Sequence, residues 1–225
     1  MFKSKNSFIH KLQMSFLVTL LVFSSMFTTF VPSAAVAAEE DTVYVSSGGV
    51  DTNAGTKDAP FATIEKALQE VENGGTVVLL SDFVLDQTLS IDNSSNILGK
   101  TATIRSDEGS TYSIIRKEDF NNQTLIQISN ANNITFENLI IDGNNVELIR
   151  SSGNFGIYVL GGSTALFENV DIVNHIVQGT GSFVVFSSGS ANVIIKDGTL
   201  IKENEIRGLI PTNPQVCLLL VREGF

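Results

Sequence analysis

The sequence predicts an all-β fold, a parallel β-helix (solenoid) with an N-terminal amphipathic cap helix. Three consecutive segments share a pattern of strand, polar turn, strand, two-residue corner and strand, and their corners recur at spacings of 31 and then 28 residues. Repeats of this length with strand content are typical of β-solenoids. One helical stripe precedes them, as expected for a solenoid that must cover the apolar cross-section of its first coil.

Residues 1–38 have the pattern of a signal peptide. Three lysines make a positive start, an apolar run follows from Phe16 to Phe23, and small residues fill 34–38 after a proline. This order of features is the one that a signal peptidase recognises. The alternative is a retained membrane anchor, but polar residues interrupt the apolar run. The sequence therefore predicts a secreted or cell-surface protein.

The mature chain is expected to be acidic. It keeps all 24 Asp and Glu residues and loses three of the 14 Lys and Arg residues, which leaves a formal charge of −13. Nucleic acid is therefore not expected as a partner, because phosphate binding requires clustered Lys and Arg. The single cysteine, Cys217, allows no internal disulfide. Abundant Asn, Ser, Thr and Gly indicate a β-rich, turn-rich fold.

The N-terminal turn and cap helix are expected within 39–75. Thr63 suits the N-cap and Glu65 suits the positive first turn of a helix that ends near Val71. The apolar stripe of this helix comprises Ile64, Ala67, Leu68 and Val71. Four apolar residues on one helical face can cover the opening of the first coil.

The loop before this helix begins Asp-x-Asn-x-Gly, which hints at a calcium site. Asp51 and Asn53 fit the first two ligand positions of such a loop. Thr56 stands where glycine is required, however, and Ala62 replaces the bidentate glutamate. We therefore interpret the loop as a turn that leads the chain into the cap helix.

The parallel β-helix coils are expected over 76–204. Aligning the repeats on their corners places Phe136, Phe167 and Ile195 in one column. Stacked aromatic rings are expected inside this column. The sequence also predicts that Asn138, Asn169 and Asp197 stack at one tight bend, because Asn tolerates left-handed backbone angles. We interpret these residues as a turn ladder rather than as ligands.

Residues 205–225 depart from the coil pattern and form an atypical tail. This segment holds two of the four prolines and the single cysteine. Our interpretation is a truncated or frame-shifted terminus. The alternative is an irregular cap in which Val216 to Val221 covers the last coil.

The segment VYVSSGGVDTNAGTKDAPFATIEKALQEVENGGTVVLLSD resembles the N-terminal opening of secreted right-handed parallel β-helix proteins of the pectin/pectate lyase-like superfamily. The matching motifs are Tyr44-Val45-Ser46, Asp51 to Thr56, Pro60 to Ile64, Glu65 to Val71 and Gly75 to Leu80. With the later coils the resemblance covers about Val43 to Asn204. It implies the fold but not the activity, because that superfamily includes lyases, hydrolases, epimerases and non-catalytic surface proteins.

The candidates for catalysis are three carboxylates, Asp142, Glu168 and Asp171. A polysaccharide lyase needs a base and usually Ca²⁺ held by several carboxylates, and a hydrolase needs paired aspartates. Asp142 and Asp171 lie at different offsets from their corners, so they are not expected in one column. Glu168 falls in line with Glu137 and Lys196, a pattern typical of a solvated face.

One histidine could join such a site, but His175 is expected to be an inert surface residue. The sequence therefore favours an exported, monomeric, non-catalytic protein that binds carbohydrate or a host surface, such as an adhesin segment. The alternative is a polysaccharide-degrading enzyme that performs pectate-lyase-like, Ca²⁺-dependent β-elimination on an acidic glycan. No cofactor is predicted, and Ca²⁺ is expected only under that alternative. The expected partner is a polysaccharide or a cell-surface glycan, and no membrane span is expected in the mature chain.

Overall fold

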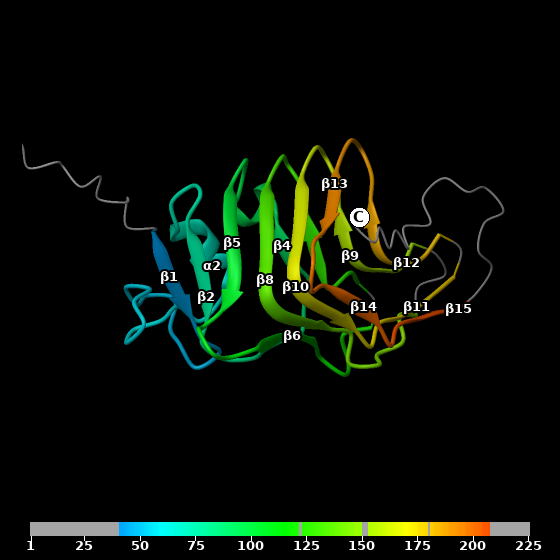
Figure 1. Cartoon of the computed structure of the whole chain (residues 1–225), viewed down its shortest axis with the longest axis horizontal. Coiled ribbons are helices and arrows are strands. Elements are labelled where there is room, and N and C mark those ends of the chain that lie inside the picture. Colours follow the sequence, from blue (N-terminus) through cyan, green and yellow to red (C-terminus); the bar gives the residue numbers. More distant parts are fainter. Residues whose placement is uncertain (1–40, 122, 150–152, 180, 208–225) are drawn as a thin grey trace, which may run out of the picture. The chain divides into compact units, whose positions relative to one another are not determined.

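The computed structural model describes residues 41–121, 123–149, 153–179 and 181–207, and these form a parallel β-solenoid (Figure 1). The predicted signal peptide and most of the predicted tail lie outside the described residues. No helix within the described ranges has the length and the apolar character that a membrane span requires.

Each coil passes through three parallel sheets in turn. Sheet I contains β1 (Thr42–Val45), β2 (Thr76–Leu79), β5 (Thr101–Ser106), the first halves of β8 (Asn133–Asp142) and β10 (Thr164–Val173), and β13 (Asn192–Ile195). Sheet II contains β3 (Phe83–Leu85), β6 (Tyr112–Arg116), the second halves of β8 and β10, and β14 (Leu200–Lys202). Sheet III contains β4 (Leu89–Ile91), β7 (Ile126–Ile128), β9 (Phe155–Val159) and β12 (Phe183–Ser187). A further parallel pair joins β11 (Ile176–Gln178) to β15 (Glu205–Arg207).

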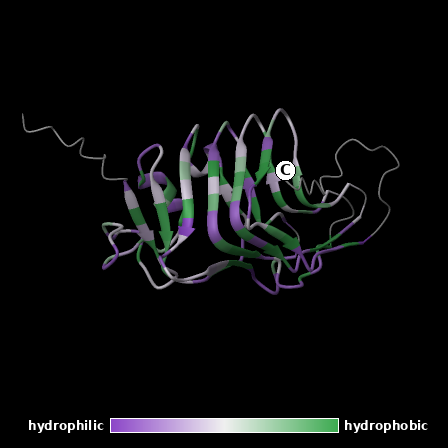
Figure 2. Cartoon of the chain, viewed as in Figure 1, coloured by the Kyte–Doolittle hydropathy of each residue, from purple (hydrophilic) through white to green (hydrophobic). Residues whose placement is uncertain are grey.

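The core is a stack of inward-facing side chains, because alternate residues of each strand point inside. Hydrophobic and hydrophilic residues accordingly alternate along the longer strands (Figure 2). Phe136 pairs in register with Phe167, which pairs with Ile195, and this confirms the predicted column. The rings of Phe136 and Phe167 stack with centroids 5.3 Å apart and planes 8° from parallel.

The last described coil is less enclosed than the coil before it. Ala165 and Phe167 of β10 are fully buried, whereas their register partners on β13, Val193 and Ile195, are only partly buried. Among the described residues, the inward-facing side chains of β13 thus pack against one neighbouring coil.

The bend between sheets I and II depends on asparagine, as predicted. Asn138 and Asn169 both have φ of 53°, in the left-handed region. Nδ2 of Asn169 donates a hydrogen bond of 2.7 Å to Oδ1 of Asn138, which links the two coils. β8 and β10 turn at the same level as a result (Figure 1).

The prediction that Asp197 continues this ladder is wrong. Gly198 adopts the positive φ of 81° in the last coil. The reason is one added residue at this corner: Phe167 pairs with Ile195, but Asp171 pairs with Leu200. A Cβ at 198 would lie 3.0 Å from Oδ1 of Asn169, so glycine also permits the close approach of the two coils.

We expect Asn169→Ala to lower the free energy of unfolding by about 2–3 kcal/mol, because alanine disfavours left-handed angles and cannot bond Asn138. Asn169→Gly keeps the backbone conformation and should cost only about 1 kcal/mol. Urea denaturation of both variants checks this difference. Equal losses would show that the backbone angle contributes nothing.

The cap helix α2 (Ile64–Glu70) forms as predicted, near the N-terminal end of the solenoid (Figure 1). Thr63 is its N-cap, and Oγ1 of Thr63 accepts a hydrogen bond of 3.2 Å from the Lys66 N–H. Ile64, Ala67 and Leu68 are buried against the first coils.

The Asp-x-Asn-x-Gly loop prepares the start of α2. Oδ1 of Asp51 accepts hydrogen bonds of 2.8 Å and 2.9 Å from the N–H groups of Ala62 and Thr63. Nδ2 of Asn53 donates to the Pro60 carbonyl at 2.9 Å. Both side chains therefore hold the turn together. Among the described residues, no three His, Cys, Asp or Glu side chains are grouped as metal ligands would be.

Candidate functional site

The three carboxylates predicted as candidates each make contacts within the solenoid wall. Oδ1 of Asp142 accepts hydrogen bonds from the Asn144 N–H at 2.7 Å and from Nδ2 of Asn174 at 3.0 Å. Glu168 forms a 2.8 Å ion pair with Lys196, and Asp171 forms one of the same length with Lys202. Each carboxylate is thus already engaged with a side chain of the following coil.

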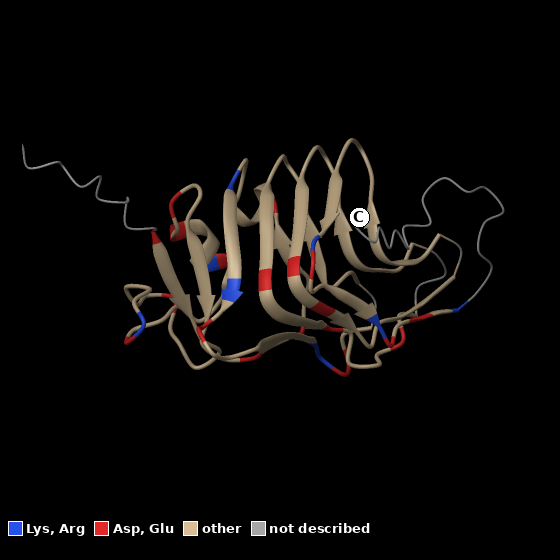
Figure 3. Cartoon of the chain, in the orientation of Figure 1, with Lys and Arg blue, Asp and Glu red and all other residues tan. Residues whose placement is uncertain are grey.

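The structure does not bring these carboxylates together. Asp142 lies level with Val173, and Asp171 lies level with Ile140. Glu168 instead follows Arg105 and Glu137 in a row of charges on sheet I, which is visible as bands on β5, β8 and β10 (Figure 3). Exposed ion pairs of this kind contribute little to stability and are common on solvated faces.

His175 is buried, so the prediction of a surface histidine is wrong. Its exposed fraction is 2%. The ring follows the bend at Asn174 and packs where Gly143 and Gly156 have no side chain. Burial and, to a lesser extent, the nearby charge of Arg116 lower the pKa of His175 to about 3, against the opposing effect of a backbone hydrogen bond at Ile141. The ring is therefore uncharged near neutral pH.

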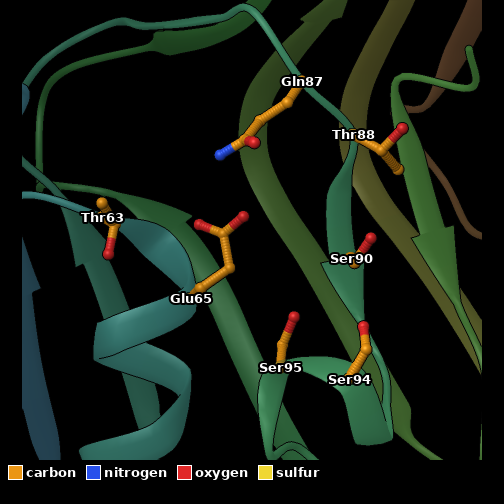
Figure 4. A pocket seen from close by; sticks show the side chains of 7 residues that line it. All are labelled: Thr63, Glu65, Gln87, Thr88, Ser90, Ser94 and Ser95. Carbon is orange, nitrogen blue, oxygen red and sulfur yellow. The ribbon is translucent and has the colours of Figure 1, made fainter.

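A polar cleft of about 340 Å³ lies between the start of α2 and the third sheet, next to the 3₁₀ helix η1 (Asn93–Ser95). Its lining side chains are Thr63, Glu65, Gln87, Thr88, Ser90, Ser94 and Ser95 (Figure 4). All seven are polar. The cleft is therefore suited to a ligand rich in hydroxyl groups.

Four lining side chains are free to bind a ligand. Glu65, Gln87, Ser90 and Ser95 form no side-chain hydrogen bond or ion pair with another described residue. The Thr88 hydroxyl, by contrast, donates to the Thr124 carbonyl at 2.7 Å. A carboxylate, an amide and two hydroxyl groups are therefore available in the cleft.

Glu65 is the charged group of the cleft, and its carboxylate projects into the open space (Figure 4). Burial raises the pKa of Glu65, and the negative charge of Asp51 raises it further, although the Glu65 backbone N–H lowers it. The sequence placed Glu65 only in the first turn of the helix. Glu65 lines a cleft only because the fold places β4 and η1 across from the first turn of α2.

Glu65→Gln is expected to stabilise the protein at pH 7. A raised native pKa means that the charged carboxylate disfavours folding at pH values above that pKa. The gain should shrink as the pH falls and the native carboxyl group becomes protonated. Thermal melts across pH 3–8 check this, with the exposed Glu72→Gln as the control. A gain that does not depend on pH would contradict it.

An aromatic cluster lies further along the same sheet, on β9 and β12. It comprises Phe155, Tyr158, Phe183 and Phe186, all partly exposed. The centroid of the Phe186 ring lies 4.7 Å from that of Phe155 and 5.1 Å from that of Phe183, and the planes of these rings are nearly parallel. The Tyr158 ring centroid lies 5.4 Å away. The Tyr158 hydroxyl bonds the Ser188 hydroxyl at 3.0 Å.

One outward-facing column connects the cleft with the aromatic cluster. Ser90 pairs in register with Gln127, Gln127 with Tyr158, and Tyr158 with Phe186. The strands β4, β7, β9 and β12 contain no charged residue. The strands of sheet III therefore present an uncharged column that leads from the polar cleft to the aromatic cluster. We call the column and its two ends the sheet III face.

The comparisons with known proteins yield two matches. No protein-family model matches the chain. The "Uncharacterized protein YwoF" of Bacillus subtilis (strain 168) is 31% identical over 155 residues, which is 66% of this chain and 32% of that protein. This chain thus spans about a third of its length. A solved structure of a rhamnogalacturonan lyase covers 75% of this chain and 50% of its own, with 17% identity and a TM-score of 0.45.

Proposed function

We propose that this protein is an extracellular β-helix that binds a carbohydrate chain without cleaving it. The observation that carries this proposal is the sheet III face, where polar side chains that are free to bind a ligand and aromatic rings lie along strands without charged residues. Export would follow from the signal peptide predicted over 1–38.

The two ends of the sheet III face match the two kinds of surface on a sugar. Sugar hydroxyl groups donate to carboxylates and exchange hydrogen bonds with amides and serines, which Glu65, Gln87 and Ser90 supply. The C–H faces of sugar rings pack on aromatic side chains, which Tyr158 and Phe186 supply. A few oriented polar groups beside apolar surface are typical of ligand sites.

The dimensions of the face favour an extended chain over a single sugar. Ser90 and Phe186 are three strand positions apart along sheet III. Parallel strands lie about 4.8 Å apart, so the column is about 14 Å long. Several sugar residues of an oligosaccharide would be needed to cover it.

The charges favour a neutral polysaccharide over an acidic one. The one charged group lining the cleft is Glu65, and its carboxylate would repel a uronate. The carboxylates considered for Ca²⁺-dependent cleavage, Asp142, Glu168 and Asp171, are engaged with neighbouring coils away from sheet III. Both features support binding of a neutral glycan without catalysis.

Affinity electrophoresis of the purified protein in gels that contain xylan, β-glucan, galactan or polygalacturonate tests the proposal. We expect retardation by at least one neutral polysaccharide. Tyr158→Ala and Phe186→Ala should each weaken binding about tenfold, which corresponds to about 1.4 kcal/mol for one lost ring contact.

The matched control is Glu168→Gln, which changes sheet I and should leave binding intact. Retardation by none of the neutral polysaccharides would overturn the proposal. Unsaturated ends that appear in polygalacturonate with Ca²⁺ would also overturn it and would favour the lyase alternative.

A further inference from the structure

A buried positive charge lies inside the solenoid at the end of β6. Arg116 is 1% exposed. Its Nη1 donates hydrogen bonds of 2.8 Å to the carbonyls of Phe120 and Gln123, and its guanidinium lies 4.8 Å from the Phe120 ring centroid. Nη2 is also buried but has no hydrogen-bond partner. One end of the guanidinium is thus fixed, and the other is unsatisfied.

No carboxylate balances this charge among the described residues. None of the ion pairs found there involves Arg116. Burial lowers the pKa of Arg116 to about 10, and no neighbouring negative charge acts to raise it. Buried charges in proteins are normally paired, so this guanidinium calls for a counter-ion.

A second unsatisfied group lies near the first. Ile115 pairs with Asp142, which places Arg116 level with Gly143, and Nδ2 of Asn144 donates to the Arg116 carbonyl at 3.1 Å. A Cβ on Gly143 would lie 2.8 Å from Cγ of His175. The His175 imidazole therefore packs against Gly143, which is level with Arg116 on the neighbouring strand. Nε2 of His175 is buried and has no hydrogen-bond partner.

Two glycines leave the room that this arrangement needs. A Cβ on Gly156 would lie 2.7 Å from Nδ1 of His175, as close as the one on Gly143. The groups that face the ring are the backbone of Gly143 and Gly156, the Val184 carbonyl and the charge of Arg116. Among the residues that the structure describes, Arg116 is the charged group that acts on the His175 ring.

We propose that Nη2 of Arg116 binds a small inorganic anion, such as chloride, inside the solenoid beside the His175 ring. The anion would accept a hydrogen bond from Nη2 and neutralise the guanidinium. The enclosed position favours a monatomic ion over an organic acid. This site is separate from the sheet III face and does not depend on the proposed glycan binding.

Anion binding should be coupled to proton uptake at His175. A hydrogen bond between the ring and the Ile141 backbone leaves Nε2 as the nitrogen that would gain a proton. An anion beside the ring favours the protonated form, and protonated Nε2 can then donate to the anion. Chloride should therefore bind more tightly as the pH falls.

The test compares thermal unfolding of the purified protein in sodium chloride, bromide and gluconate at equal ionic strength. Gluconate, an organic anion much larger than a halide, serves as the reference. We expect Tm to be about 5 °C higher in 100 mM chloride or bromide than in gluconate, with a larger difference at pH 5 than at pH 8. Crystals soaked in sodium bromide should show an anomalous peak beside Nη2 of Arg116.

Two variants separate this site from a general effect of salt. Arg116→Met should lose the chloride effect, because methionine packs in the same space without a charge. His175→Leu retains Arg116, so it should keep part of the effect but lose its pH dependence, and it serves if Arg116→Met does not fold. Equal Tm values in chloride and gluconate would overturn the proposal. A bromide peak elsewhere, or a chloride effect that persists in Arg116→Met, would also overturn it.

Discussion

Asn132→Ala is expected to lower the free energy of unfolding by about 3–5 kcal/mol. Asn132 is fully buried, and its Oδ1 accepts a 2.6 Å hydrogen bond from the Lys100 N–H. Its Nδ2 lies 2.8–3.1 Å from three backbone carbonyls, those of Ile91, Ile97 and Ser129. Alanine would leave several buried backbone groups unsatisfied, at about 1–3 kcal/mol each.

The neighbouring residue provides the control for Asn132. Asn133 is exposed, and its side chain makes a single long contact of 3.5 Å with the Ala131 carbonyl. Asn133→Ala should therefore change stability by less than about 0.5 kcal/mol. Urea denaturation followed by circular dichroism measures both variants. Similar losses for the two would contradict a special role for the buried amide.

Phe167→Ala is expected to cost about 3–5 kcal/mol of stability as well. Phe167 is fully buried, it stacks on Phe136, and it contacts Ile195 of the following coil through register pairing. Its truncation removes the transfer energy of the ring and leaves a cavity that parallel coils cannot close easily. Phe167→Leu retains most of the volume and should cost markedly less.

Chemical denaturation distinguishes these outcomes for Phe167. If alanine and leucine were equally destabilising, the loss would come from the missing aromatic stack rather than from the cavity. A loss below about 1 kcal/mol for Phe167→Ala would show that the coils collapse around the gap.

The sequence predicted the parts of the fold that repeat. Phe136, Phe167 and Ile195 could be aligned because the bend beside them tolerates few residue types. Asp197 was misplaced because one added residue shifts the bend to Gly198 without changing the apolar pattern. His175 was misplaced because its side chain turns inward after a bend, and no periodicity indicates that direction.

The candidate site could be predicted from the sequence only in part, because one of its ends comes from segments that precede the aligned repeats. Ser90, Gln127, Tyr158 and Phe186 are 37, 31 and 28 residues apart, since loops of different length separate their strands. The last two spacings equal those of the corners, so the alignment based on the corners places Gln127, Tyr158 and Phe186 in one column. Register pairing in three dimensions is needed to join Ser90, and with it the cleft, to this column.

The partly buried side chains of β13 imply that local unfolding is not equally easy in every coil of the solenoid. A coil with neighbours on both sides loses two interfaces when it opens, but among the described residues Val193 and Ile195 share an interface with one coil. Among the described coils, local opening is therefore expected to be easiest at β13 and to become harder toward the capped end. Amide hydrogen exchange would record this as protection that rises steadily from β13 to β8.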